Sequence, residues 1–125
     1  MNILCDTHIL IWAMMDSKKL TKEARSIIEN ADTIYLSSAS LWEMSIKVAL
    51  GKLELDLTEV LSFLEEMNVK PLPITWKHSI QVEHLPFHHH DPFDRMLIAQ
   101  AITESLILLT HDKDLASYTH WVKCV

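Results

Sequence analysis

Residues 2–6 are Asn2-Ile3-Leu4-Cys5-Asp6, a short apolar run that ends directly at a carboxylate. A short run of apolar residues without polar alternation is typical of a strand that is buried on both faces. Such a strand needs helices above and below it, so this stretch predicts a sheet between two helical layers. The carboxylate then lies at the carboxyl end of the strand, where parallel sheets bind their ligands.

The rest of the chain alternates between short apolar runs and segments with helical spacing of apolar residues. Further strands are expected at residues 33–36, 106–109 and 121–125, with an edge or irregular strand at 69–74 because it contains Pro71 and Pro73. Helices are expected at residues 8–15, 21–31, 41–50, 57–67, 76–85, 92–104 and 112–118. Thr21 begins the second of these helices, and Gly51 terminates the third. This alternation predicts one α/β domain over residues 1–125, in three α/β/α layers with a mainly parallel central sheet.

The composition limits the possible functions. Eleven basic and seventeen acidic side chains give a net charge of −6, whereas nucleic-acid-binding proteins are usually basic. The acidic balance is compatible with a site where carboxylates gather around a cation. The single glycine, Gly51, excludes a glycine-rich phosphate-binding loop.

The sequence also indicates where the protein works. No apolar run approaches the roughly 18–20 residues of a membrane span, and the first residues lack the basic and apolar regions of a secretion signal. Cys5 and Cys124 lie in apolar stretches and are interpreted as small buried side chains without a disulfide. We therefore expect a cytoplasmic protein without a membrane association.

Four acidic residues follow a predicted strand or begin a predicted helix: Asp6, Glu43, Asp94 and Asp112. Together they are expected at one edge of the sheet. Four carboxylates so close would repel one another and raise each other's pKa, unless a hard cation such as Mg²⁺ or Mn²⁺ lies among them. The joint placement therefore predicts a divalent-metal site.

Each acid also has a structural interpretation. Asp6 and Asp112 could cap the helices that follow them. Ser40-x-x-Glu43 matches a capping box in the first turn of its helix. Asp114 competes with Asp112 for the fourth position, but it lies further into the helix and is expected to be solvated.

The segment around Asp94 needs a choice between two acids. Asp91 followed by Pro92 is a typical helix start, so we assign the cap to Asp91 and the site to Asp94. Trp42, beside Glu43, is expected to pack in the core. The alternative is that its ring stacks on a nucleobase.

The run His88-His89-His90 just before this helix is interpreted as a polar loop, because three consecutive side chains cannot all point at one metal. A more modest functional role is that His90 or Arg95 contacts a substrate phosphate.

Several blocks resemble a known family. They are Leu4-Cys5-Asp6-Thr7-His8, Ser40-Leu41-Trp42-Glu43-Met44-Ser45-Ile46-Lys47, Gly51-Lys52-Leu53, the block from Asp91 to Ala101, and Leu109-Thr110-His111-Asp112. With these blocks the chain resembles the PIN-domain ribonucleases, and among them the VapC-type toxins of toxin–antitoxin pairs. The resemblance runs nearly end to end.

The resemblance implies a PIN-like nuclease domain and Mg²⁺- or Mn²⁺-dependent endonuclease action on RNA. Asp6, Glu43 and Asp94 match the three acidic positions of the family, and Asp112 matches a fourth, more variable one. Thr7 and Thr110 match polar positions that assist the acids. A homodimer and a cognate antitoxin encoded beside the toxin are also implied.

The expected chemistry is hydrolysis of a phosphodiester by a metal-activated water. The water attacks phosphorus in line with the bond to the leaving 3′ oxygen. The downstream fragment then carries a 5′ phosphate. The alternative is a non-catalytic module of the same fold that binds RNA or a protein. A receiver-like phosphoacceptor domain fits poorly, because Asp6 lacks an acidic neighbour.

Overall fold

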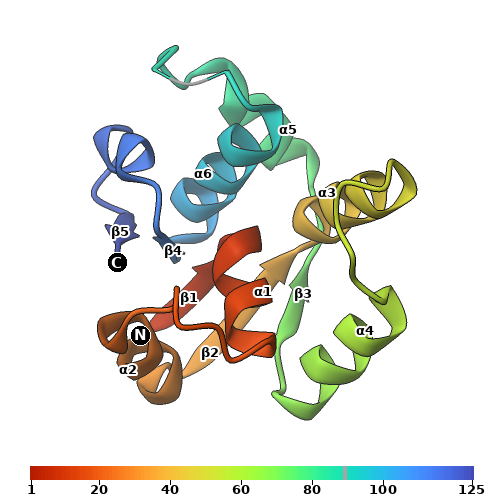
Figure 1. Ribbon diagram of the computed structural model, residues 1–125. Coiled ribbons are helices and arrows are strands. Elements are labelled where there is room, and N and C mark those ends of the chain that lie inside the picture. The colour runs from red at the N-terminus through yellow and green to blue at the C-terminus, as the bar shows by residue number, and fades with distance from the viewer. Residues whose placement is uncertain (89) are drawn as a thin grey trace.

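The computed structural model describes residues 1–88 and 90–125 and contains a five-stranded, entirely parallel sheet (Figure 1). The strands are β1 (Asn2–Cys5), β2 (Thr33–Ser37), β3 (Lys70–Leu72), β4 (Ile107–Thr110) and β5 (Val122–Cys124). The helices are α1 (Thr7–Met14), α2 (Lys22–Asn30), α3 (Ser38–Ala49), α4 (Leu57–Glu66), α5 (Trp76–Glu83), α6 (Pro92–Glu104) and the short 3₁₀ helix η1 (Lys113–Ser117). The predicted α/β class with a parallel sheet is confirmed.

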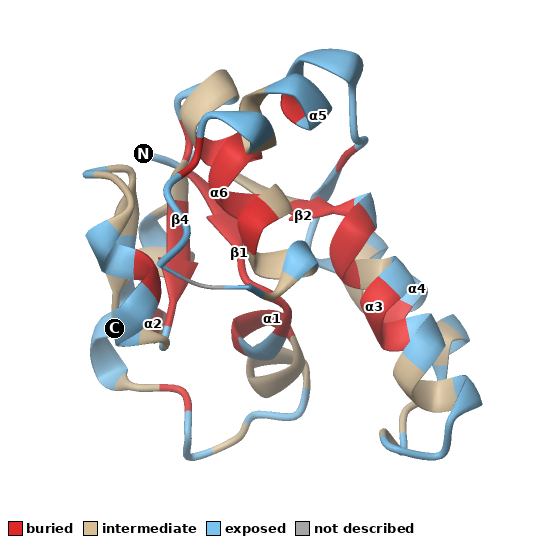
Figure 2. Cartoon of the chain, turned by 90° about the horizontal axis from the view of Figure 1, so that it is seen from above, coloured by how far each residue is buried: buried red, intermediate tan, exposed pale blue. Residues whose placement is uncertain are grey.

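The central strand β1 contributes to two separate cores. Ile3 and Cys5 pack into one core with residues of α1, α2, α3 and α4, whereas Leu4 packs into a second core with α5, α6 and η1. Figure 2 shows the buried residues concentrated along β1, β4 and the inner sides of the helices. Alternate side chains of a strand point to opposite faces, so an uninterrupted apolar run supplies both cores.

The order of the strands, β3-β2-β1-β4-β5, places a reversal between β1 and β4. From β1 the chain first builds outward through β2 and β3, and it then returns to the other side of β1 to form β4 and β5. In open parallel sheets, the crevice beyond the carboxyl ends of the strands at such a reversal is where ligands bind. Cys5 is in register with Leu109, so Asp6 and Thr110 come side by side at this crevice.

Two local predictions are confirmed, one for the edge strand β3 and one for the end of helix α3. The short strand β3, which contains Pro71, lies at the edge of the sheet, as the missing proline N–H group requires. Gly51 follows the end of α3 with a φ of +71°, a conformation that glycine adopts without a steric penalty.

The predicted capping box of α3 is wrong. The helix begins at Ser38, and Ser37, the last residue of β2, accepts a hydrogen bond from the Ala39 N–H at 3.0 Å. An earlier serine therefore takes the capping role. Ser40 lies inside the helix, where its buried hydroxyl has no hydrogen-bond partner in the described part of the chain.

The two cysteines are free thiols, as expected, with Cys5 buried and Cys124 half-buried. Burial, together with the nearby charge of Asp6, raises the pKa of the Cys5 thiol to about 12. No helix in residues 1–88 and 90–125 is long and apolar enough to cross a membrane.

We predict that one thiol of the native protein reacts with a disulfide reagent at mildly alkaline pH, and that this thiol is Cys124. The raised pKa keeps Cys5 protonated, and the thiolate is the reactive form. Absorbance of the released thiol measures the reaction. A native Cys124→Ser variant should react only after denaturation, and rapid labelling of that folded variant would contradict the prediction.

Candidate active site

Asp6 lies directly after β1 and is almost fully buried, with 5% of its surface exposed. Its Oδ1 accepts hydrogen bonds from the N–H groups of His8 at 2.7 Å and Ile9 at 3.4 Å, so the carboxylate caps α1. Its Oδ2 accepts a hydrogen bond of 2.6 Å from the Thr110 hydroxyl at the end of β4. The capping interpretation is therefore correct, and the same carboxylate also contacts the end of β4 through Thr110.

The hydroxyl of Thr110 joins Asp6 to the segment that follows β4. While it donates to Asp6, it accepts a hydrogen bond from the Asp112 N–H at 3.1 Å. Asp112 is half-buried and caps η1 by accepting from the Asp114 N–H at 2.9 Å, whereas Asp114 is exposed. Of the two competing acids, Asp112 is the one connected to Asp6 through a shared partner.

Glu43 enters the site from α3. Because the helix begins at Ser38, Glu43 lies in its second turn and not in the first turn as expected. The buried carboxylate accepts a hydrogen bond on Oε1 from the Thr7 hydroxyl at 2.9 Å, and Thr7 is the residue next to Asp6. Its Oε2 lies 3.2 Å from the Lys47 ammonium group. A glutamate four residues before a lysine is a familiar helical pair, so the spacing could have predicted this contact.

Asp94 is the third residue of α6 and is half-buried. Asp91 caps the helix, as predicted, by accepting hydrogen bonds from the N–H groups of Phe93 at 2.9 Å and Asp94 at 3.1 Å. The cap therefore leaves the Asp94 carboxylate to a different role. A negative charge at this position is also favoured by the positive end of the helix.

Trp42 is not in the core as expected, since 60% of its surface is exposed. The core position of this part of α3 is taken by Met44, which is completely buried. Two residues correspond to roughly 200° around a helix, so the two side chains point in nearly opposite directions. The Trp42 ring contacts Phe93 of α6 edge-on, with 5.2 Å between the ring centroids.

The donor atoms at this edge of the sheet are carboxylate and hydroxyl oxygens, the kind that Mg²⁺ and Mn²⁺ prefer. With the side chains as oriented, no three His, Cys, Asp or Glu residues among those described gather closely enough to hold a metal ion. The oxygens of Asp6 and Glu43 are instead turned toward Thr110, Thr7 and Lys47. The residues present fit a hard divalent cation in their chemistry, and reorientation of these carboxylates would be needed to bind it.

The histidine-rich loop comes just before α6 in the chain, and His88 and His90 are both exposed. The His88 ring contacts Tyr118 at 5.1 Å between centroids, and the His90 ring lies 6.3 Å from that of Phe87. His89 lies outside the described residues. These contacts agree with a polar loop.

The suggested phosphate contact of Arg95 is not supported, because this side chain is buried. Its guanidinium donates hydrogen bonds to the carbonyl groups of Pro86 at 2.8 Å and of Val82 and Leu85 at 3.3 Å. Arg95 therefore anchors the segment between α5 and the histidine-rich loop. No sequence pattern signals this role, because the three carbonyl acceptors belong to the backbone, which is the same in every residue.

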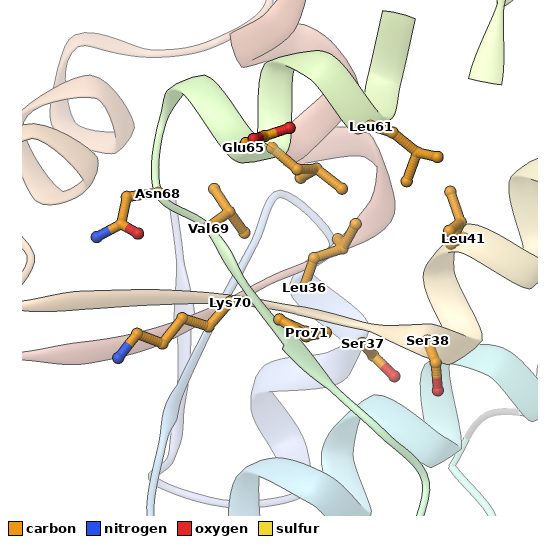
Figure 3. Close-up of a pocket in the computed structure, with 11 residues that line it drawn as sticks. Leu36, Ser37, Ser38, Leu41, Leu61, Glu65, Asn68, Val69, Lys70 and Pro71 are labelled. Atoms are coloured by element: carbon orange, nitrogen blue, oxygen red, sulfur yellow. The ribbon is translucent and has the colours of Figure 1, made fainter. Parts of the chain in front are cut away.

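An apolar cavity of about 520 Å³ is not lined by any of the four candidate acids and lies between α4, β3 and the start of α3 (Figure 3). Leu36, Leu41, Leu61 and Val69 point toward one another across it, with Ser37, Ser38, Leu64, Glu65, Asn68, Lys70 and Pro71 completing the lining. None of the four acids is among these described lining residues.

The fold and the site define an α/β/α domain with an all-parallel sheet and acidic residues at its topological reversal. The PIN domain family matches residues 3–120, and the chain belongs to this family.

Individual relatives agree with this membership. The chain is 29% identical over 121 residues to Ribonuclease VapC22 of Mycobacterium tuberculosis, covering 94% of this chain and 92% of that protein. It superposes on VapBC2 from Rickettsia felis bound to a promoter DNA fragment with a TM-score of 0.73 and 16% identity, covering 100% and 98% of the two chains. DNA-bound VapBC from Salmonella typhimurium gives a TM-score of 0.69 and 15% identity, with 100% and 97% covered. The two structural comparisons bear on the fold alone.

We predict that Thr110→Val lowers the free energy of unfolding by about 1–3 kcal/mol, because it leaves the buried Asp6 carboxylate and the Asp112 N–H without their shared partner. Urea denaturation followed by circular dichroism measures the loss. Thr110→Ser, which keeps the hydroxyl, and Thr103→Val, at a partly exposed position of α6, are the controls. Equal losses for Thr110→Val and Thr103→Val would contradict the assigned hydrogen bonds.

Proposed function

We propose that the protein is a divalent-metal-dependent endoribonuclease in which Asp6, Glu43, Asp94 and Asp112 hold Mg²⁺ or Mn²⁺. The observation that carries this proposal is the network at the end of β1, in which Thr110 links Asp6 to the Asp112 backbone and Thr7 engages Glu43. Membership of the PIN domain family and the similarity to a protein named as a ribonuclease support it.

Neighbouring residues of the chain hold the candidate metal-binding acids in place. The N–H groups at the start of α1 and the Thr110 hydroxyl keep Asp6 at the end of β1, and the Thr7 hydroxyl keeps Glu43 next to it. A change of side-chain orientation would then turn the oxygens of both acids toward the cation. Lys47 offsets part of the negative charge beside Glu43. When bound, the divalent ion would lower the pKa of a water molecule and stabilise negative charge on the phosphoryl oxygens.

The proposed reaction is hydrolysis of an RNA phosphodiester bond. A water oxygen would bond to phosphorus as the bond to the 3′ oxygen breaks. The downstream fragment would then carry a 5′ phosphate and the upstream fragment a 3′ hydroxyl. One of the acids would orient the attacking water and accept its proton, and a proton from solvent would convert the leaving 3′ oxygen to the hydroxyl.

We also infer that the protein is the toxin of a type II toxin–antitoxin pair and acts in the cytoplasm as a homodimer. The structures described above are of VapBC proteins, and a similar structure from Klebsiella pneumoniae is a toxin–antitoxin complex (TM-score 0.68, 18% identity, 97% and 95% covered). An apolar segment of the antitoxin would find room in the cavity between α4, β3 and α3 (Figure 3). Burial of such a segment would remove the apolar lining from water.

The second candidate is a non-catalytic module that binds RNA or a protein. The specific observation in its favour is that Asp6 and Glu43 are engaged by hydroxyl groups and a lysine and, among the described residues, do not form a metal-binding group with a third acid. Metal binding or RNA binding without turnover would distinguish it from the nuclease.

We predict that the purified protein cleaves single-stranded or structured RNA with Mg²⁺ or Mn²⁺ and not with EDTA. Asp94→Asn should lower the cleavage rate on the order of 100-fold or more, because it removes a charge that acts on the reacting centre. Gel analysis of labelled RNA measures the rate, and circular dichroism checks the fold. Cleavage by folded Asp94→Asn at the parental rate would contradict the assigned role, and 3′ phosphate ends would contradict the proposed chemistry.

We further predict that Asp112→Asn slows cleavage by roughly tenfold or more, as expected for a residue that holds or orients a metal ligand. Asp114→Asn should leave the rate nearly unchanged, because Asp114 is exposed and only its backbone contacts Asp112. The two substitutions make the same change of charge two residues apart, and the same RNA assay compares them. A larger loss of cleavage rate for Asp114→Asn than for Asp112→Asn would assign the fourth acidic position to Asp114 in place of Asp112.

A further inference from the structure

Two aromatic rings lie directly beside two of the candidate catalytic acids. Trp42 precedes Glu43 on α3, and Phe93 precedes Asp94 on α6. The rings meet edge-on, 5.2 Å apart at an interplanar angle of 69°. Neighbouring residues on a helix point about 100° apart, so each ring flanks its acid. The pair therefore spans the two helices that carry Glu43 and Asp94.

Packing of the hydrophobic core does not account for the position of the Trp42 side chain. Met44 fills the core position of this turn, while Trp42 leaves 60% of its large apolar surface in contact with water. The contact with Phe93 holds the indole against α6. A ring that is already held loses less conformational entropy when a ligand stacks on it.

We propose that Trp42, supported by Phe93, is a stacking platform for one nucleobase of single-stranded RNA, next to the bond that is cleaved. This inference rests on the proposed nuclease function. Single-stranded RNA is commonly bound by stacking of unpaired bases on aromatic side chains, and every base offers a flat face for such a contact. The Lys47 ammonium, 3.2 Å from Glu43 on the same helix, supplies positive charge close to the path of the RNA backbone.

A protein partner would be the other possible occupant of this surface. Ile46 and Leu50 follow Trp42 at intervals of four residues and are also exposed, which forms an apolar strip along α3. The strip leads away from the acids, however, whereas the ring pair lies next to Glu43 and Asp94. The position of the rings therefore favours the substrate.

RNA binding in an Asp94→Asn background, where cleavage is removed, tests the platform. The probes are labelled single-stranded RNA of random sequence and a ribose-phosphate oligomer of equal length without bases. Fluorescence anisotropy should show that Trp42→Leu weakens binding of the RNA roughly tenfold, and that Trp42→Phe restores most of the affinity. Neither substitution should change binding of the abasic oligomer. Trp76→Leu is the matched control, because Trp76 is 88% exposed on α5 and should not affect either probe.

The possible failures are distinguishable. Unchanged RNA binding by Trp42→Leu would overturn the platform and leave the nuclease proposal intact. The platform would also be overturned if Trp42→Phe bound as poorly as Trp42→Leu, or if Trp42→Leu changed the oligomeric state measured by light scattering and not the RNA affinity. Failure of the folded Asp94→Asn protein to bind any RNA would overturn the platform, whereas the nuclease proposal is decided separately by cleavage with the parental protein. Thermal unfolding of each variant checks that a loss of affinity does not reflect a loss of fold.

Discussion

The buried carboxylate of Asp6 is the constraint on which the site depends. A charge with only 5% of its surface exposed is costly unless hydrogen-bond donors surround it. The donors come from the first N–H groups of α1 and from the hydroxyl of Thr110 on β4. Satisfying this one charge therefore fixes the end of β1, the start of α1 and the end of β4 relative to each other. The remaining acids are arranged around that fixed point.

Structural roles and the proposed functional roles fall on the same acidic residues and their neighbours. Asp6 and Asp112 cap the helices that follow them, and Asp91 takes the cap of α6 so that Asp94 does not have to. Both caps use carboxylate oxygens that accept hydrogen bonds from backbone N–H groups. Parallel strands end at one edge of the sheet, where the helix N-termini collect, so acids that cap these helices are gathered there. An acidic active site is compatible with this fold because the fold already places acids at that edge.

Much of the fold could be predicted from local patterns. The bounds of β1 and α6 match the expected strand and helix, and the edge position of β3 follows from its prolines. The errors came from competition between local alternatives. Ser37 and Ser40 are both good caps, and only the end of β2 decides between them. Trp42 is apolar enough for the core, but Met44 occupies that direction of the helix. Arg95 is bound by backbone carbonyls, which every sequence contains.

The sequence by itself determined the class of the domain and the capping roles of Asp6, Asp91 and Asp112, because burial and capping act over a few residues and leave a local pattern. Only the tertiary structure decided that β4 lies beside β1. That pairing brings the Thr110 hydroxyl to Asp6 across 104 residues of chain, and it separates the role of Asp112 from that of Asp114. Strand order is a choice between non-local pairings of similar apolar runs. It is decided by the packing of the whole domain, which no short segment encodes.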